Sequence, residues 1–221
     1  MQQVICTVDV VLLTLQDNSL RVALLKRDRE PFKGVLALPG GFIHPEEDAD
    51  TQEAALRVLA NKTGIEPPYL EQLATFSGPA RDPRAWSVSI VYYALVPHDV
   101  IAKAGHQDVK LASVDRPLNL PFDHKTIVDT AVARLRSKSQ YSSLPCYLAG
   151  ESFTLPQLQR VYEALMGEPL NKVSFRRKMT EMDMLEPIEG AFSAGGAHRP
   201  AQMYRLKPAL RDQLTLIERG L

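Results

Sequence analysis

Residues 38–66 read LPGGFIHPEEDADTQEAALRVLANKTGIE and carry the local signals from which the fold can be inferred. A short apolar strand runs into two adjacent glycines, an acidic loop follows, and the pattern predicts a helix from Asp50 to Lys62. Asp50 is a typical helix N-cap, and Gly64 stands where a glycine commonly ends a helix. A glycine turn, an acidic loop and a short helix in this order indicate an element that handles phosphate groups with a metal ion.

One face of this predicted helix lacks the residues that metal binding would need. Positions i, i+3 and i+4 share a face, and here they hold Val58, Asn61 and Lys62. Mg²⁺ prefers carboxylate oxygens, whereas valine offers no ligand, asparagine a neutral one, and lysine a positive charge. We therefore expect no metal, no catalytic residues and little hydrolysis. Two interpretations of Lys62 remain: it neutralises a bound diphosphate, or it is a solvated cation favoured by the helix dipole.

Composition places the chain among ordinary globular proteins. It has 221 residues, 45% of them hydrophobic and 24% charged, and its formal net charge is zero. This length suits one large or two small domains, and the balanced charge predicts no overall attraction to nucleic acid or membrane. The apolar run after Met1 is too short to span a bilayer. The two cysteines suggest no disulfide framework, so we expect a cytoplasmic location, with Cys6 buried in its apolar strand.

The first 140 residues alternate between strand and helix patterns. Strands are expected over residues 4–14, 20–27, 35–41, 73–79, 86–97 and 109–114, and a helix capped by Asp123 runs to Arg136. Residues 137–152 show little periodicity and several small polar side chains, so we place the domain boundary there. The predicted domains are 1–140 and 150–221.

The second domain has the layout of a winged helix-turn-helix. Thr154 and Gln157 form a capping box, and Gly167 ends the helix that they begin. Asn171 can cap a second helix, two short strands surround EGAFSAGGAHRP, and a further helix is expected from Pro208. A helix, a short turn, a second helix and a glycine-rich hairpin are typical of this DNA-binding module.

The second helix of this module is strongly basic at its start. Cations are disfavoured by the dipole at a helix N-terminus, so a cluster there suggests an anionic partner rather than only a solvated surface. Arginine and lysine can bind guanine in the major groove, and asparagine can bind adenine. We predict that DNA is contacted by Asn171, Lys172, Ser174, Arg176, Arg177 and Lys178, and by His198 and Arg199 of the hairpin.

GGFIHPEEDADTQEAALRVLANKTGI resembles the signature of the Nudix superfamily. Arg57 matches the arginine of the signature, and Gly64 with Ile65 match its end. The loop glutamate corresponds to Glu46 or Glu47, while the three helix glutamates are replaced, as described above, by Val58, Asn61 and Lys62. The resemblance implies an α/β/α sandwich with a mixed sheet over about residues 1–140.

A second stretch is similar to Nudix proteins that act on ADP-ribose, namely Arg81, Asp82, Pro83 and Arg84. The two arginines could bind a diphosphate, or they could lie in a solvent-facing loop with an internal ion pair to Asp82. Phe76, Trp86 or Tyr92 could stack on adenine. The candidate ligand-binding residues are Arg27, Gly40, Gly41, Arg57, Lys62, Phe76, Arg81 and Arg84.

Together the two halves resemble the Nudix-related regulators of NAD metabolism, the NrtR family. The resemblance implies a bacterial homodimer that represses genes of NAD biosynthesis or salvage on a two-fold symmetric double-stranded DNA operator. ADP-ribose or a related nucleotide would be the effector that releases DNA, with no cofactor. The alternative is an active hydrolase of ADP-ribose or another nucleoside diphosphate derivative, whose metal site has moved to Glu46, Glu47, Asp48 and Asp50.

Overall fold

The computed structural model describes residues 4–105, 108–193 and 200–210. The chain divides into two compact units, residues 1–134 and 135–221. The division falls inside helix α3 (His124–Ser139), slightly before the segment 137–152 in which the sequence placed the boundary. That segment is less irregular than its composition suggested, because it contains helix α4 (Leu144–Ala149) with buried side chains.

The first unit is built on a mixed sheet. Its strands are β1 (Ile5–Gln16), β2 (Ser19–Lys26), β3 (Leu36–Ala37), β4 (Gly40–Phe42), β5 (Tyr69–Gly78), β6 (Ser87–Leu95) and β7 (Val109–Ser113). The order is β3-β2-β1-β6-β5, with β4 paired to β1 and β7 paired to β2. β1 is parallel to β6 and antiparallel to β2 and β4, which makes β1 the centre of the sheet.

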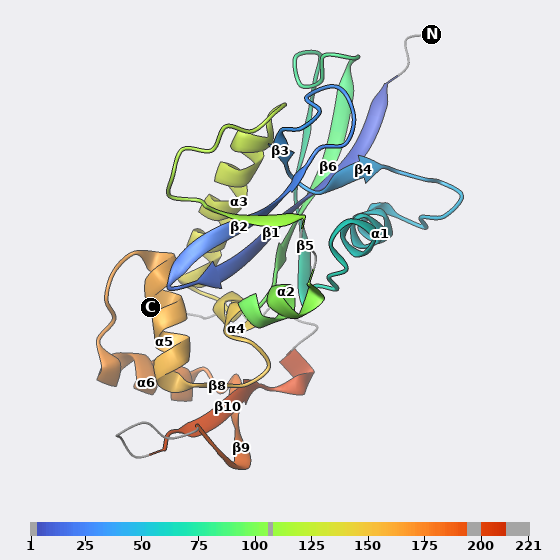
Figure 1. The fold of residues 1–221 in the computed structure, drawn as a ribbon. Coiled ribbons are helices and arrows are strands. Elements are labelled where there is room, and N and C mark those ends of the chain that lie inside the picture. The colour runs from blue at the N-terminus through green and yellow to red at the C-terminus, as the bar shows by residue number, and fades with distance from the viewer. Residues whose placement is uncertain (1–3, 106–107, 194–199, 211–221) are drawn as a thin grey trace. The chain divides into compact units, whose positions relative to one another are not determined.

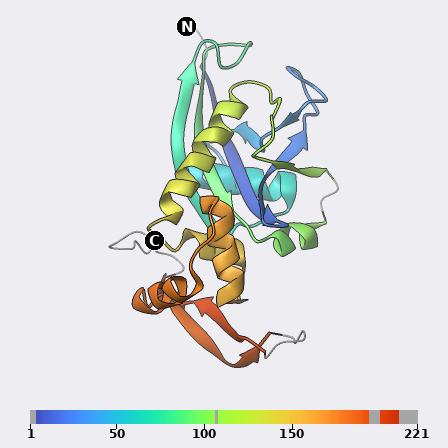
Figure 2. The same ribbon diagram turned by 90° about the vertical axis from the view of Figure 1, so that its left-hand side faces the viewer.

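Helices cover both faces of this sheet. α1 (Thr51–Thr63) and α3 lie on opposite sides of it, as the two ribbon views show (Figures 1 and 2). The expected α/β/α sandwich with a mixed sheet is thereby confirmed. A short helix, α2 (His98–Ala104), was not predicted from the sequence.

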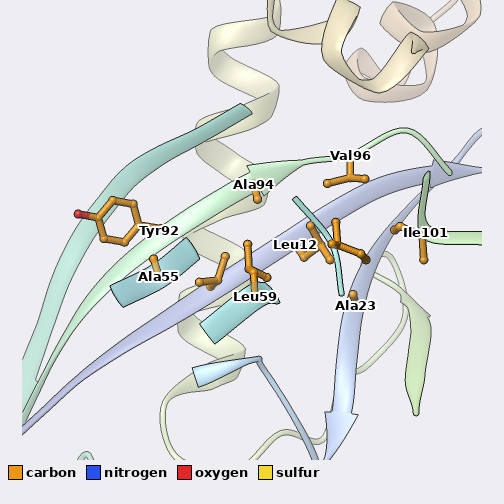
Figure 3. Packing of buried hydrophobic residues seen from close by; sticks show 10 residues of the cluster. Leu12, Ala23, Ala55, Leu59, Tyr92, Ala94, Val96 and Ile101 are labelled. Atoms are coloured by element: carbon orange, nitrogen blue, oxygen red, sulfur yellow. The ribbon is translucent and has the colours of Figure 1, made fainter. Parts of the chain in front are cut away.

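The core under α1 follows from the alternation of side chains along β1. Val10 and Leu12 belong to one buried cluster with Ala55 and Leu59 of the helix and with Ile101 of α2. Figure 3 shows Leu12, Ala55, Leu59 and Ile101 in this cluster. Successive residues of a strand face opposite sides, so Asp9 faces away from this cluster. An acidic side chain thus lies within a central strand without entering the apolar cluster under α1.

The second unit is a winged helix. It comprises β8 (Phe153–Thr154), α5 (Leu155–Met166), α6 (Lys172–Glu181), β9 (Leu185–Phe192), β10 (Gln202–Leu206) and the 3₁₀ turn η1 (Pro208–Leu210), with strand order β8-β10-β9. The predicted capping box is present, since Gln157 N–H donates to Thr154 Oγ1 and Thr154 N–H donates to Gln157 Oε1. The rings of Tyr162 and Phe175 pack edge to face at 5.5 Å between centroids. This contact joins α5 to α6.

Some local expectations are wrong. Cys6 is exposed rather than buried. Asp123 precedes α3, but one of its carboxylate oxygens accepts a hydrogen bond from Arg81, and the other has no hydrogen-bond partner among the described residues, so its side chain does not cap the helix. The expected helix from Pro208 is a 3₁₀ turn as far as residue 210, and its remainder lies outside the described residues. Within the described ranges, no helix is long and apolar enough to cross a membrane.

Candidate functional site

A pocket of about 500 Å³ lies in the first unit, where β1, β4, α1 and the segment after β2 meet. Its charged lining consists of Lys26, Arg27, Arg29, Arg57, Lys62, Arg81 and Arg84 against Asp9, Asp28, Glu30, Asp82 and Asp108. The cations outnumber the acids, so the pocket favours an anion. A diphosphate esterified at both ends, with one negative charge on each phosphate, suits this excess. Seven of the eight predicted ligand residues line the pocket, and Phe76 does not.

The two glycines of the pocket wall allow very close packing. Gly40 pairs with Asp9 in the β1–β4 ladder, and a Cβ on Gly40 would lie 2.0 Å from Asp9 Oδ1. A Cβ on Gly41 would lie 2.9 Å from Cγ2 of Val58. A larger residue at either position would force a neighbour to shift, chiefly the Asp9 carboxylate or the Val58 side chain, so the double glycine permits this close packing.

The α1 face that would hold a metal ion carries one buried apolar side chain, one amide and one ammonium group. Val58 is buried against Gly41, and Asn61 is exposed on the pocket wall. Lys62 Nζ donates a hydrogen bond to the carbonyl oxygen of Gly40. Burial lowers the pKa of Lys62, although Asp28 and Asp9 oppose the shift. Within the part of the chain that the structure describes, Lys62 has no ion-pair partner within 4 Å, and only the more distant carboxylates of Asp28 and Asp9 act on its charge.

Arg27 is a second cation without an acidic partner among the described residues. Its Nε donates to the carbonyl oxygen of Pro31 at 2.8 Å, and its guanidinium carbon lies 4.9 Å from the ring centroid of Phe122. Burial and then the charge of Arg84 lower the pKa of Arg27. Arg27 and Lys62 thus give the pocket two positive charges that the protein itself leaves unbalanced.

Arg57 forms hydrogen bonds within the protein that connect three segments. Its Nε and Nη2 donate to the two carboxylate oxygens of Asp48 at 2.6 and 2.8 Å, and Nη2 also donates to the Phe42 carbonyl oxygen at 3.0 Å. The Arg57 hydrogen bonds lower the pKa of Asp48 to about 2. These contacts tie α1 to the acidic loop and to β4. The charge of Arg57 is therefore largely used within the protein.

Arg81 is also engaged internally. Only 7% of its side chain is exposed. Its Nη2 donates to Asp9 Oδ2 at 2.8 Å and its Nε donates to Asp123 Oδ2 at 3.0 Å. Ser89 Oγ donates to the same Asp9 oxygen at 2.7 Å. Arg81 is consequently not a solvent-facing loop residue, and two carboxylates already balance its charge.

His124 completes this cluster beside the pocket. Its Nδ1 accepts a hydrogen bond from the Leu38 N–H at 3.1 Å, so the proton of the neutral ring is on Nε2, which lies 3.7 Å from Asp9 Oδ1. Burial lowers the pKa of His124, while Asp9 raises it. Neither Asp9 nor His124 was predicted from the sequence as a site residue. A single acid in the apolar run of residues 4–14 was the available signal for Asp9.

For Arg84 the sequence left two alternatives, a contact to a diphosphate or an internal ion pair with Asp82. The structure contains the ion pair. Its Nη2 lies 2.7 Å from Asp82 Oδ2, and its backbone N–H donates to Asp82 Oδ1 at 2.9 Å. Burial opposes ionisation of Asp82, but the hydrogen bonds from Arg84 hold its pKa below the usual value. Arg84 still lines the pocket and lies 5.9 Å from the ring centroid of Phe42.

The aromatic rings at the pocket are not those that the sequence suggested. Phe76 and Trp86 do not line it, and Tyr92 is 4% exposed, with its hydroxyl hydrogen-bonded to Thr51 at 2.7 Å. Phe42 and Phe122 line the pocket instead. These two rings are the aromatic side chains that the pocket lining offers among the described residues.

The residues present do not fit the magnesium site that the Nudix fold implies. Asp50 Oδ1 is used as the α1 N-cap, accepting from the backbone N–H groups of Gln52 and Glu53, and Asp48 is held by Arg57. Among the described residues, one group could still supply three metal ligands, since ligand atoms of His44, Glu46 and Glu47 lie within 4.8 Å of one another. Both glutamates are exposed and neither lines the pocket.

The second unit presents its basic helix to solvent. Asn171 Oδ1 accepts from the Val173 and Ser174 N–H groups at 3.0 Å each, which confirms the predicted cap. Phe175 and Met179 are buried. Five predicted DNA-contacting residues are exposed on α6 or at its start, namely Asn171, Lys172, Ser174, Arg176 and Arg177. Lys178 is half-buried, and His198 and Arg199 lie outside the described residues.

Comparisons with known proteins match both units. Residues 7–131 match the model of the NUDIX domain, and residues 145–206 match that of the NrtR DNA-binding winged helix domain. The ADPR responsive transcriptional repressor NtrR of Acinetobacter baylyi is 39% identical over 210 residues, covering 93% of this chain and 82% of the relative. An ADP-ribose pyrophosphatase of Methanocaldococcus jannaschii is 40% identical over 119 residues, covering 51% of this chain and 65% of the relative.

Solved structures of Shewanella oneidensis NrtR are similar as well. The structure with a 27mer DNA has a TM-score of 0.89 and 40% identity, covering 98% of this chain and 99% of that chain. The NUDIX domain of the same protein, complexed with ADP ribose, has a TM-score of 0.54 and 40% identity, covering 61% of this chain and 90% of that chain.

Proposed function

This chain belongs to the NrtR family of regulators, which join a NUDIX domain to a winged helix, and from this premise we propose that it represses transcription in response to a nucleotide. The winged helix binds a two-fold symmetric DNA operator. The NUDIX pocket binds ADP-ribose, or a closely related nucleotide, as the effector that releases the DNA. The regulated genes are those of NAD biosynthesis or salvage.

The pair of unbalanced cations, Arg27 and Lys62, is the observation that carries the effector proposal. Both charges face the pocket, and neither has an acidic partner in the described part of the chain. Charge-assisted hydrogen bonds to phosphate are among the strongest polar contacts. A diphosphate placed between these residues balances both charges, and the Phe122 ring beside Arg27 offers an apolar surface for the base.

Lys62 supports binding without a metal ion. An ammonium group on this helix face provides positive charge for the diphosphate, and it repels a divalent cation at the same position. Ligand binding and hydrolysis are thereby separated, because an ammonium group cannot activate water as a bound metal can. We expect the affinity for ADP-ribose to be the same in EDTA and in Mg²⁺, as measured by isothermal titration calorimetry. A strict requirement for Mg²⁺ would contradict this account.

Release of DNA requires that the effector bind the DNA-free state more tightly than the DNA-bound state. The ratio of the two affinities is the coupling, which is typically worth about 1–3 kcal/mol in such proteins. A two-fold symmetric operator also requires two copies of the winged helix, so the repressor acts as a homodimer.

Gel shifts with operator DNA and increasing ADP-ribose test the proposal. The expected result is loss of the shifted band in the wild type. Arg27→Ala should need a higher ADP-ribose concentration for the same release, while binding DNA normally in its absence. A band that persists at saturating ADP-ribose, with ligand binding shown separately, would reject the effector role.

Hydrolysis of ADP-ribose is the second candidate function. The group His44, Glu46 and Glu47 and the similarity to an ADP-ribose pyrophosphatase favour it. The engagement of Asp48 by Arg57 and of Asp50 in the α1 cap argues against it. Incubation with ADP-ribose and Mn²⁺, followed by chromatography of the products, separates the two functions. Turnover that disappears in the double variant Glu46→Gln, Glu47→Gln would establish the hydrolase.

A further inference from the structure

Val173 is a large apolar side chain in a charged environment. It is the second residue of α6 and is 76% exposed, more than any other large hydrophobic residue in the described part of the chain. Its neighbours one turn later are Arg176 and Arg177, which are also exposed. Residues at i, i+3 and i+4 share a helix face. Val173 therefore belongs to the basic face of α6, away from buried Phe175 and Met179.

Nothing within α6 accounts for a valine at this position. The side chain is not part of the unit's core, and β-branched residues are poorer helix formers than alanine at exposed sites. The cap of the helix comes from Asn171, not from Val173. An apolar group held in water at the start of a basic helix is instead consistent with a partner that covers it.

The chemistry of the major groove limits what that apolar group can contact. Base edges there present donors and acceptors, with the C5 methyl of thymine as the apolar group. The N-terminal part of a recognition helix is the part that meets base edges, and helical side chains lean toward the N-terminus. Resting on the DNA binding proposed above, we propose that Val173 packs against a thymine methyl in each half-site and selects thymine at that position.

The proposal also changes the role expected of Asn171. Its side-chain oxygen accepts two backbone hydrogen bonds as the α6 cap. The bidentate contact by which asparagine identifies adenine needs both that oxygen and the amide nitrogen. Selection of an A·T pair at the start of α6 thus rests on the methyl group of thymine rather than on the amide of Asn171.

Selection from a random duplex library with the full-length protein provides the sites for the test. Each thymine of the enriched sequence is then replaced in turn by deoxyuridine, which lacks only the methyl group, and affinities are measured by fluorescence anisotropy. The wild type should lose affinity roughly fourfold at one position per half-site, the value for exposing about one methyl group. Val173→Ala should bind the thymine and deoxyuridine sites equally.

Phe192→Ala is the matched control, because Phe192 is exposed in the same unit but lies on β9. This variant should discriminate thymine from deoxyuridine as the wild type does. Equal discrimination by Val173→Ala and the wild type at every position would overturn the inference and leave the repressor proposal intact. Failure to enrich any duplex would overturn both.

Discussion

Single residues in the pocket differ in whether a carboxylate already balances their charge. Arg81 and Arg84 lie in the sequence motif that indicated an ADP-ribose ligand, yet each is bound to aspartates of the protein. Arg27 and Lys62 donate only to backbone carbonyl groups within the described chain. The cost of desolvating a charge is recovered only when an opposite charge meets it. The unbalanced pair is therefore where an anionic ligand gains most.

Lys62→Met tests this distinction. Methionine keeps the length of the side chain but removes the ammonium group, and a hydrogen bond to a charged group is worth about 1.5–3 kcal/mol. We expect the affinity for ADP-ribose to fall by roughly tenfold or more, measured by calorimetry, with little change in Tm. Lys33→Met, an exposed lysine outside the pocket lining, is the control. Similar losses in both variants would argue against a specific role of Lys62.

Asp48 gives the first unit a pH-dependent stability. Its pKa in the folded protein is about 2 because of the Arg57 hydrogen bonds, whereas an unfolded aspartate has a pKa near 4. This contribution is complete above about pH 4 and is lost as pH falls through about 2. Denaturant unfolding at a series of pH values should show it. Asp48→Asn should be less stable at neutral pH, and its difference from the wild type should shrink on acidification; a constant difference would refute the assignment.

Capping residues determine where the predicted helices begin. Asp50, Thr154 and Asn171 cap the helices that the sequence assigned to them. α2 and α4 were missed because they are short and weakly patterned, and α4 lies among the small polar residues that suggested a linker. Short helices owe their stability mainly to tertiary packing, which local pattern does not reveal.

The cap of α6 can be separated from its role in DNA binding. Asn171→Ala should destabilise the second unit by about 1 kcal/mol, because two backbone N–H groups lose their acceptor. Asn171→Asp keeps the acceptor and suits the helix dipole, so it should retain stability. Its negative charge should nevertheless weaken DNA binding. Thermal unfolding and anisotropy measure the two effects, and normal DNA affinity in Asn171→Asp would place this residue away from the DNA.

Because β4 and α1 are in close contact, we expect substitutions at Gly41 and Val58 to have non-additive effects on stability. Gly41→Ala places a Cβ too close to Val58 Cγ2, and overpacking of this kind costs about 1–3 kcal/mol. Val58→Ala removes the obstructing methyl groups. In urea unfolding, the double variant should therefore lose less stability than the two single variants combined. Simple additivity would show that β4 and α1 adjust independently.

For the whole molecule, the proposed function assigns the effector to one unit and DNA to the other. Under that proposal, the basic helix of the second unit would supply the electrostatic part of DNA affinity, while the formal net charge of the chain is zero. Binding should therefore depend on a localised set of phosphate contacts rather than on an overall field. The proposed switch couples these contacts to occupancy of a pocket in the other unit.

The salt dependence of operator binding measures how many phosphate contacts the protein makes. The logarithm of the association constant should fall linearly with the logarithm of salt concentration. If exposed Arg176 contacts a phosphate, Arg176→Ala should reduce the slope by about one for each bound helix. Arg160→Ala, which alters a cation on α5, is the comparison. An unchanged slope in Arg176→Ala would mean that this arginine does not neutralise a phosphate.

Much of this organisation was determined by the sequence alone. Apolar periodicity and caps predicted the elements and the winged-helix layout, and the resemblance to the Nudix signature implied the sandwich. The absence of carboxylates at Val58, Asn61 and Lys62 was visible without coordinates. These features are local, because they depend on residues close together in the chain.

Only the tertiary structure decided which charges face the pocket unbalanced. Asp9, Arg81 and Asp123 belong to separate segments that the fold brings together. Arg27 and Lys62 line the same pocket, and no ion pair is found for either within the described residues. It likewise placed Phe42 and Phe122, and not Phe76, in the pocket lining. Ion pairing and stacking depend on distances of a few ångströms between residues that are remote in sequence, and no local pattern contains those distances.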